Sequence, residues 1–152
     1  MRVEINRAID LLRKKLVGEF ISRFSVGDTW NLYFDDFWLL AQEVIPEDET
    51  LVSQFLENNT RWYNGAVDKE QIARSAFVAA CMRKEIKEVE LDQLCNLMIR
   101  FEDNSVLILP TNADIVDWQW YLNNTGASPY SEYSLACFWA GEIEVAEDEW
   151  LN

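Results

Sequence analysis

The sequence contains no histidine, and this absence removes several kinds of chemistry at once. Without imidazole, the chain cannot build a Ser-His or Cys-His nucleophile pair, an imidazole general base, or a zinc site that needs histidine. It also has no Cys-x-x-Cys motif for a structural metal or a redox pair, and no EF-hand loop. With five glycines, it has no glycine-rich phosphate-binding loop. Carboxylates are the catalytic groups that remain.

Long apolar runs are absent as well. No stretch approaches the roughly 18 uninterrupted apolar residues that a membrane-spanning helix requires. Residues 1–7 are broken by charges and lack the apolar region of a signal peptide, so we expect a cytoplasmic protein with no membrane partner. The cysteines are odd in number and sit in apolar contexts, so we expect reduced core thiols, with one intermolecular disulfide as the alternative, at Cys81, Cys95 and Cys137.

Basic residues are scarce, and their number falls from the N-terminal to the C-terminal part of the chain. Thirteen Lys and Arg residues face 27 Asp and Glu residues, for a net charge of −14. Residues 1–24 carry +3 and residues 25–100 carry −7, while residues 101–152 hold ten acids and no base and carry −10. Such a field disfavours nucleic acid and favours a basic partner. The alternative explanation is that acidity only keeps the protein soluble.

What the chain does contain is enough apolar sequence for a folded domain. A length of 152 residues with 49% apolar content fits a single domain over residues 1–152. Apolar spacing predicts an amphipathic helix over residues 3–15, and helices that begin near Pro46 and Asp68, the second running to about residue 87. Alternation predicts a three-stranded meander over residues 19–45 and a last strand within residues 133–146. Residues 112–122 fit a helix or a strand.

Two stretches with the same pattern organise the predicted sheet. Residues 97–110 are predicted to form two strands joined by a two-residue turn at Asp103-Asn104, residue types that tolerate positive φ. Residues 31–40 repeat this order, with Asp35-Asp36 at the turn. We expect two hairpins of one antiparallel sheet. The predicted fold class is therefore α+β, a mostly antiparallel sheet built from hairpins with helices packed on it.

Together with the acidic, Trp-rich C-terminal third, these patterns resemble the small acidic immunity proteins of bacterial polymorphic toxin systems, including contact-dependent growth inhibition. The residues that carry the resemblance run from Leu32 to Asp36 and from Ile99 to Ile108, and they cover the sheet but not the helix that begins near Asp68. The resemblance implies a cytosolic protein that binds one cognate toxin domain, often a basic nuclease, and blocks it. No motif of the resemblance fixes individual binding residues.

Acidic and aromatic side chains are the contacts that we expect with such a partner. Carboxylates steer a basic surface toward the chain, and Trp and Tyr are frequent binding anchors. We expect Trp120 and Tyr130 to act as anchors, with half-buried packing as the alternative for each. We expect no cofactor, no metal and no catalysis. The carboxylates expected at the partner are Glu102, Asp103, Glu142, Glu144, Glu147, Asp148 and Glu149.

Two other classes of function remain open. An acidic nucleic-acid mimic would sequester a host protein that binds DNA or RNA. A carboxylate-based enzyme, possible with or without a metal, would use neighbouring acids for acid-base or metal chemistry. Hairpin turns also favour Asp for backbone reasons, which explains the two turn pairs without catalysis. The candidate pairs are Asp35-Asp36, Glu102-Asp103, Asp114 with Asp117, and Glu142 with Glu144.

Overall fold

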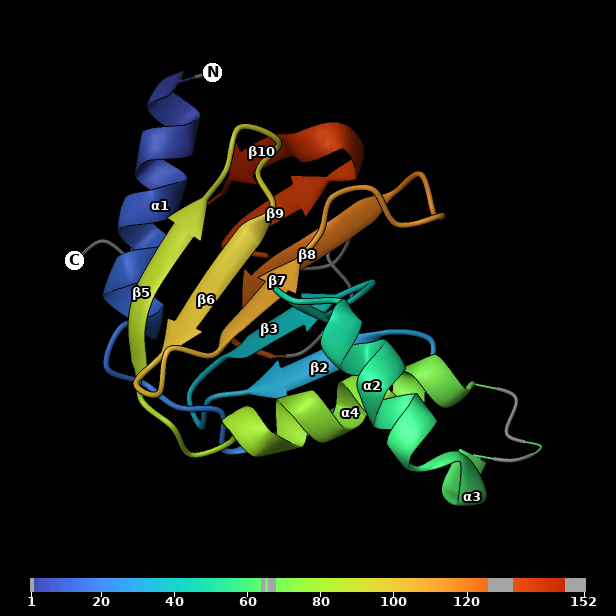
Figure 1. Cartoon of the computed structure of the whole chain (residues 1–152). Coiled ribbons are helices and arrows are strands. Elements are labelled where there is room, and N and C mark those ends of the chain that lie inside the picture. The colour runs from blue at the N-terminus through green and yellow to red at the C-terminus, as the bar shows by residue number, and fades with distance from the viewer. Residues whose placement is uncertain (1, 64, 66–67, 126–132, 147–152) are drawn as a thin grey trace.

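The structure is a computed structural model that describes residues 2–63, 65, 68–125 and 133–146 (Figure 1). Within these residues the strands form two open sheets, and each strand pairs antiparallel with its neighbours. The predicted α+β fold class is therefore confirmed.

The larger sheet has six strands and contains the predicted meander. Its strand order is β1-β2-β3-β8-β9-β10. In β2, Trp30 and Leu32 are buried and alternate with half-buried polar residues, so one face of this sheet packs on the core. The bounds are β1 (Arg23–Val26), β2 (Trp30–Tyr33), β3 (Trp38–Ala41), β8 (Trp118–Asn123), β9 (Leu135–Phe138) and β10 (Glu142–Val145).

The smaller sheet has four strands in the order β4-β7-β6-β5. Its short first strand follows β3 in the chain but pairs with β7, through Ile45 and Ile108, so the chain leaves the larger sheet after β3. It returns to the larger sheet at β8. The bounds are β4 (Ile45–Pro46), β5 (Ile86–Leu91), β6 (Leu97–Phe101) and β7 (Val106–Leu109).

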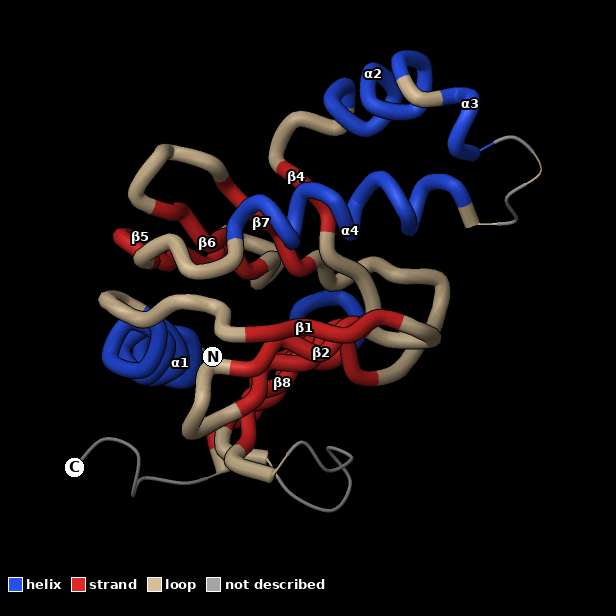
Figure 2. Tube along the Cα trace, turned by 90° about the horizontal axis from the view of Figure 1, so that it is seen from below, coloured by secondary structure: helices blue, strands red, loops and turns tan. Residues whose placement is uncertain are grey.

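The first helix joins the two sheets along one side. It contacts β5 and β10, which are edge strands of the smaller and the larger sheet, and Figure 2 shows it alongside both layers. Leu12 and Leu16 of its apolar stripe are fully buried, while its basic last turn is mostly exposed. The helices are α1 (Arg2–Leu16), α2 (Thr50–Asn58), α3 (Thr60–Tyr63) and α4 (Lys69–Cys81).

One continuous core cluster holds the sheets and α1 together. It contains Trp30 and Trp120 from the larger sheet and Ile99 and Phe101 from the smaller one, together with Leu12 of α1. Because burial of apolar surface is the main favourable term in folding, the two sheets stabilise each other. None of the described residues forms a helix that is both long enough and apolar enough to cross a membrane.

The two predicted hairpins exist, but the expectation that they share a sheet is wrong. The β2–β3 hairpin has a two-residue turn closed by the hydrogen bond from Phe34 N–H to Phe37 O at 3.0 Å. The β6–β7 hairpin belongs to the smaller sheet. Its loop has three residues rather than two, because Phe101 N–H bonds Ser105 O at 2.9 Å. Within this loop, the residue with positive φ is Asn104, at 69°.

Three other predictions shift for local backbone reasons, and one open choice is decided. The helix predicted to run from Asp68 to about residue 87 ends at Cys81, because Met82 is extended and Arg83 has a positive φ of 65°. Residues 118–123 form a strand, which settles the helix-or-strand choice for residues 112–122. The helix near Pro46 begins at Thr50, because Pro46 belongs to β4. The last strand is two strands, since positive φ at Ala140 and Gly141 reverses the chain between β9 and β10.

The β6–β7 loop predicts a contrast between two variants of Asn104. Asn104→Gly should leave stability unchanged or raise it, because glycine adopts positive φ without cost. Asn104→Val should destabilise the protein by about 1–2 kcal/mol, because a β-branched side chain is strained there. Urea unfolding of both variants measures this, and equal losses would mean that the Asn104 side chain, not its backbone conformation, matters.

Candidate partner-binding surface

The acidic residues expected at the partner are divided between two ends of the smaller sheet. Glu102 and Asp103 lie in the loop that follows β6. Glu142 is the first residue of β10 and follows Gly141. Gly141 lies against Leu94, which is in the loop that precedes β6, because a Cβ atom added to Gly141 would be 2.3 Å from the backbone oxygen of Leu94. The length of β6 therefore separates the two sets, as Figure 1 shows, and they do not form a single surface.

The expectation that Trp120 anchors a partner is wrong. Its side chain is 0% exposed, and its indole Nε1–H donates a hydrogen bond to the Cys95 carbonyl oxygen at 3.1 Å. Strand alternation turns Trp120 into the core and its neighbour Tyr121 to the opposite face of the sheet. The expected contacts that fall outside the described residues are Tyr130, Glu147, Asp148 and Glu149.

Two of the expected carboxylates have partners within the fold. Asp103 accepts hydrogen bonds from the Lys84 ammonium and from the hydroxyl and backbone N–H of Ser105, which hold the pKa of its carboxyl well below the usual range. Glu144 accepts a hydrogen bond from the Tyr133 hydroxyl at 2.6 Å, and this bond raises the pKa of Tyr133 to about 12. Both carboxylates therefore already contribute to local structure.

A different surface gathers exposed apolar side chains at the end of the molecule where Glu142 lies. We call it the apical patch and define it by Leu94, Ile115, Val116 and Trp139, which are 63%, 52%, 74% and 44% exposed. They come from three loops, which follow β5, β7 and β9. Apolar side chains scattered singly over a surface need no explanation, but a group on adjoining loops indicates an interaction site.

Hydrogen bonds of Thr111, in the second of these loops, join that loop to the first and to the third. The Thr111 hydroxyl donates to Leu94 O at 2.9 Å, and its backbone N–H donates to Asn96 Oδ1 at 2.9 Å. Ala140 N–H donates to Thr111 O at 3.0 Å, and Trp139 N–H donates to Asp117 O at 2.9 Å. The three segments that carry the apical patch are thus bonded to one another.

The fully buried amide of Gln119 fixes the middle loop from beneath. Its Oε1 accepts a hydrogen bond from Ala113 N–H at 2.9 Å. Its Nε2 donates to the carbonyl oxygens of Ile115 at 2.7 Å and of Asp117 at 3.1 Å. A buried side chain with three such bonds holds the backbone around Ile115 and Val116 in one conformation.

The same loops hold two of the five described residues other than glycine that have a positive φ. Cys95 and Ala140 adopt positive φ values of 61° and 65°, which cost a residue with a Cβ atom about 1 kcal/mol or more each. Gly141, at φ 87°, has no Cβ, and the close approach of Leu94 O requires this. Strained backbone persists where the surrounding contacts hold it, and such positions often lie at binding sites.

Carboxylates lie on the loops of the apical patch and at their ends. Those on the described residues are Asp92, Asp114, Asp117 and Glu142. Between residues 88 and 123 the chain has a single base, Arg100, which pairs with Glu88. The loops of the patch therefore carry both exposed apolar side chains and carboxylates, although the Asp92 carboxylate accepts hydrogen bonds within its own loop, from the backbone N–H groups of Leu94 and Asn96. The sequence carried a partial signal for it, since Ile115 and Val116 stand between two acids, but their spacing also fits the apolar face of a helix.

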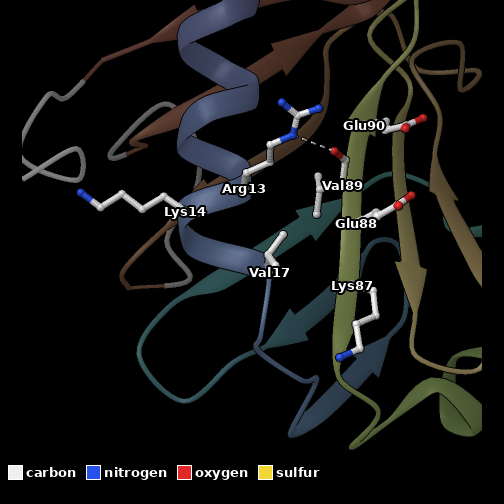
Figure 3. A pocket seen from close by; sticks show the side chains of 7 residues that line it. All are labelled: Arg13, Lys14, Val17, Lys87, Glu88, Val89 and Glu90. Atoms are coloured by element: carbon white, nitrogen blue, oxygen red, sulfur yellow. Dashed lines mark hydrogen bonds between the residues drawn. The ribbon is translucent and has the colours of Figure 1, made fainter.

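The basic end of α1 faces a groove of a different character. Figure 3 shows Arg13 reaching from α1 to the edge strand β5, where its Nε–H donates to Val89 O at 3.4 Å. Lys87, also at the groove, pairs with Glu85 at 2.9 Å, and Lys14 points away from β5 in Figure 3. These basic side chains cover an edge strand or keep the outer face of the helix solvated. Their presence therefore does not require an anionic ligand.

The described cysteines and carboxylates do not form a metal site or a disulfide. All three cysteines are buried and unpaired, as the sequence predicts, and burial raises the pKa of each thiol. Among the described residues, no three Asp, Glu or Cys side chains converge in a group that could hold a metal ion. Comparison of the chain with protein-family models, curated proteins and solved structures found no match of any of the three kinds.

The apical patch predicts that Gly141 is essential for stability. Gly141→Ala should destabilise the protein by about 2 kcal/mol or more, because the new methyl group would overlap Leu94 O in a backbone conformation that alanine disfavours. Gly27→Ala is the matched control, since nothing lies within 4 Å of an added Cβ and its φ is not in the positive region. Urea unfolding compares the stability of the two variants. Equal stability would show that the loops shift to accommodate the added methyl group at little cost.

Proposed function

We propose that this protein is a non-catalytic inhibitor that acts in the cytoplasm by binding a basic protein domain and blocking it. The observation that carries the proposal is the apical patch, in which exposed apolar side chains on interlocked loops accompany carboxylates. The resemblance to immunity proteins suggests the class of partner, a toxin domain, with a basic nuclease as the first candidate.

The chemistry of the apical patch supports a protein partner with an apolar site and a basic rim. Apolar side chains that become fully covered supply most of the binding free energy and slow dissociation. The carboxylates add charge complementarity, which speeds association and selects basic partners over acidic ones. Because the loops are fixed before binding, little conformational entropy is lost when the partner docks. A single domain of matching shape is therefore favoured over many basic proteins.

Salt dependence separates this proposal from that of an acidic nucleic-acid mimic. A mimic that relies on carboxylates alone would bind several nucleic-acid-binding proteins and would release them as ionic strength rises. Binding through apolar anchors survives salt that screens exposed charges. The four exposed apolar residues of the apical patch favour the second behaviour.

The first test is capture of the partner from a bacterial host that carries this chain. The tagged protein should retain one basic protein in near-equal amount when washing is raised from about 0.1 M to about 1 M NaCl, which shortens the Debye length to about 3 Å. Production of the captured domain alone should then stop growth, and co-production of this chain should restore it. A broad set of basic proteins that wash off together would contradict a dedicated inhibitor.

Variants of the apical patch test the anchors and the charges separately. Val116→Ala and Trp139→Ala should each weaken binding by about 10-fold or more, at low and at high salt, because each removes apolar contact without changing the charge. The double variant Asp114→Lys/Glu142→Lys should weaken binding mainly at low salt. Isothermal titration calorimetry measures these constants.

Each apical variant has a control elsewhere on the surface. Ile72 of α4 is 43% exposed, an exposed fraction similar to that of Trp139, but it lies outside the apical patch. The Ile72→Ala variant should therefore bind normally. Glu57 and Glu70 are exposed acids of α2 and α4, and Glu57→Lys/Glu70→Lys matches the charge change. Equal loss of affinity in control and apical variants would place the binding surface elsewhere.

A further inference from the structure

A second feature, independent of the apical patch, is a pocket between the helices and the β6–β7 hairpin. It has a volume of about 250 Å³ and opens between the start of α2, the end of α4 and the hairpin loop. That volume suits a ligand smaller than a typical drug molecule. Its apolar wall consists of Leu51, Phe77, Ala80, Val106 and Leu107.

An ion pair and a short polar network form one side of the pocket. The Lys84 ammonium donates to Asp103 Oδ2, which joins the chain after α4 to the hairpin loop. Asp103 also accepts hydrogen bonds from the backbone N–H and hydroxyl of Ser105. The Ser105 hydroxyl lies 3.7 Å from the Cys81 thiol, whose pKa is raised by burial. These contacts fix the hairpin against α4, so the pocket wall is in place before a ligand arrives.

The charges around the pocket select the sign of a ligand. Lys84 is already neutralised by Asp103, so it offers no free positive charge to an anion. Glu47 and Asp48 also line the pocket. Asp48 uses Oδ1 to accept hydrogen bonds from Thr50, while Glu47 has no ion-pair partner among the described residues. The excess of carboxylates, within a chain of net charge −14, disfavours anionic ligands and favours cationic ones.

We propose that this pocket binds a small organic cation with an apolar body, such as an arylalkyl ammonium ion. The apolar part lies against Leu51, Phe77 and Leu107, and the ammonium group lies at the rim beside Glu47. Leu51 is 38% exposed, and a ligand in the pocket covers part of it. The inference does not rest on the apical patch or on the proposed inhibition of a toxin.

The direct test is amide NMR titration with three probes of similar shape and different charge. The 2-phenylethylammonium ion should shift signals of residues that line the pocket, with a dissociation constant on the order of 1 mM. Neutral 2-phenylethanol should bind more weakly, and the 3-phenylpropanoate anion at least about 10-fold more weakly than the cation. No shift of pocket signals with the cation, or equal binding of the anion, would overturn the proposal.

Matched variants identify the pocket as the site. Ala80 lines the pocket and Ala79 does not, although both are exposed on α4. Ala80→Trp should fill the pocket and weaken the cation about 10-fold or more, whereas Ala79→Trp should not. Glu47→Gln should weaken the cation and leave the neutral probe unchanged, and Glu57→Gln should change neither. If Ala80→Trp and Ala79→Trp weaken cation binding equally, the ligand binds outside the pocket. If Glu47→Gln leaves cation binding unchanged, Glu47 does not recognise the ammonium group.

A chemical readout comes from the Cys81 thiol, which lines the pocket. Cys81 lines the pocket, whereas Cys95 and Cys137 are 1% and 0% exposed elsewhere in the core. The cation should slow alkylation of Cys81 in the folded protein in proportion to its occupancy of the pocket. Mass spectrometry of peptides measures this, and alkylation of Cys81 at an unchanged rate under saturating cation would contradict occupancy of the pocket.

Discussion

The hydrogen bond from the Trp120 indole to the Cys95 carbonyl fixes how the two sheets of this molecule meet inside their shared apolar core. It runs from the larger sheet to the turn between β5 and β6 of the smaller one, inside a core that both sheets share. A buried carbonyl without a partner would cost about 1–3 kcal/mol, so this bond fixes the position of the turn. It also holds Cys95 at positive φ, and the residue before it is the exposed Leu94. The hydrogen bond between Trp120 and Cys95 therefore also helps to position Leu94 in the apical patch.

Hydrogen bonds of this kind, to buried side chains, hold the exposed loops of the apical patch in one conformation. Loops are usually the least stable parts of a fold, because few buried contacts hold them. Here the three loops at the apical patch are bonded to one another and to buried side chains, Gln119 and Trp120. Strain at Ala140 is the cost of the arrangement, and the close contact of Gly141 with Leu94 is its consequence. Rigid apolar side chains at a surface retain more of their burial energy on binding than mobile ones do.

Sequence periodicity predicted which segments form strands much better than it predicted where the strands go. The helix at the N-terminus, the meander and the second hairpin follow from local patterns, because each depends on neighbouring residues. The division into two sheets depends on β4 pairing with β7 across more than sixty residues, and alternation carries no information about such pairing. Trp120 illustrates the same limit. A shift by one residue exchanges it with Tyr121 between the faces, and the pattern of residues 118–122 allows both.

The distribution of acids also changes meaning once the fold is known. Residues 101–152 carry ten acids and no base, and the sequence alone predicts that seven of these acids contact one partner. Strand β6 instead separates Glu102 from Glu142, and Asp103 and Glu144 bind partners within the fold. Among the described residues, the acids of this segment are therefore divided between separate parts of the molecule, and they act as a long-range field that any basic protein would feel. A field of this kind speeds encounters but does not choose among basic partners, so specificity has to come from shaped apolar contact. Among the expected carboxylates that the structure describes, Glu142 is the one that lies at the end of a loop of the apical patch.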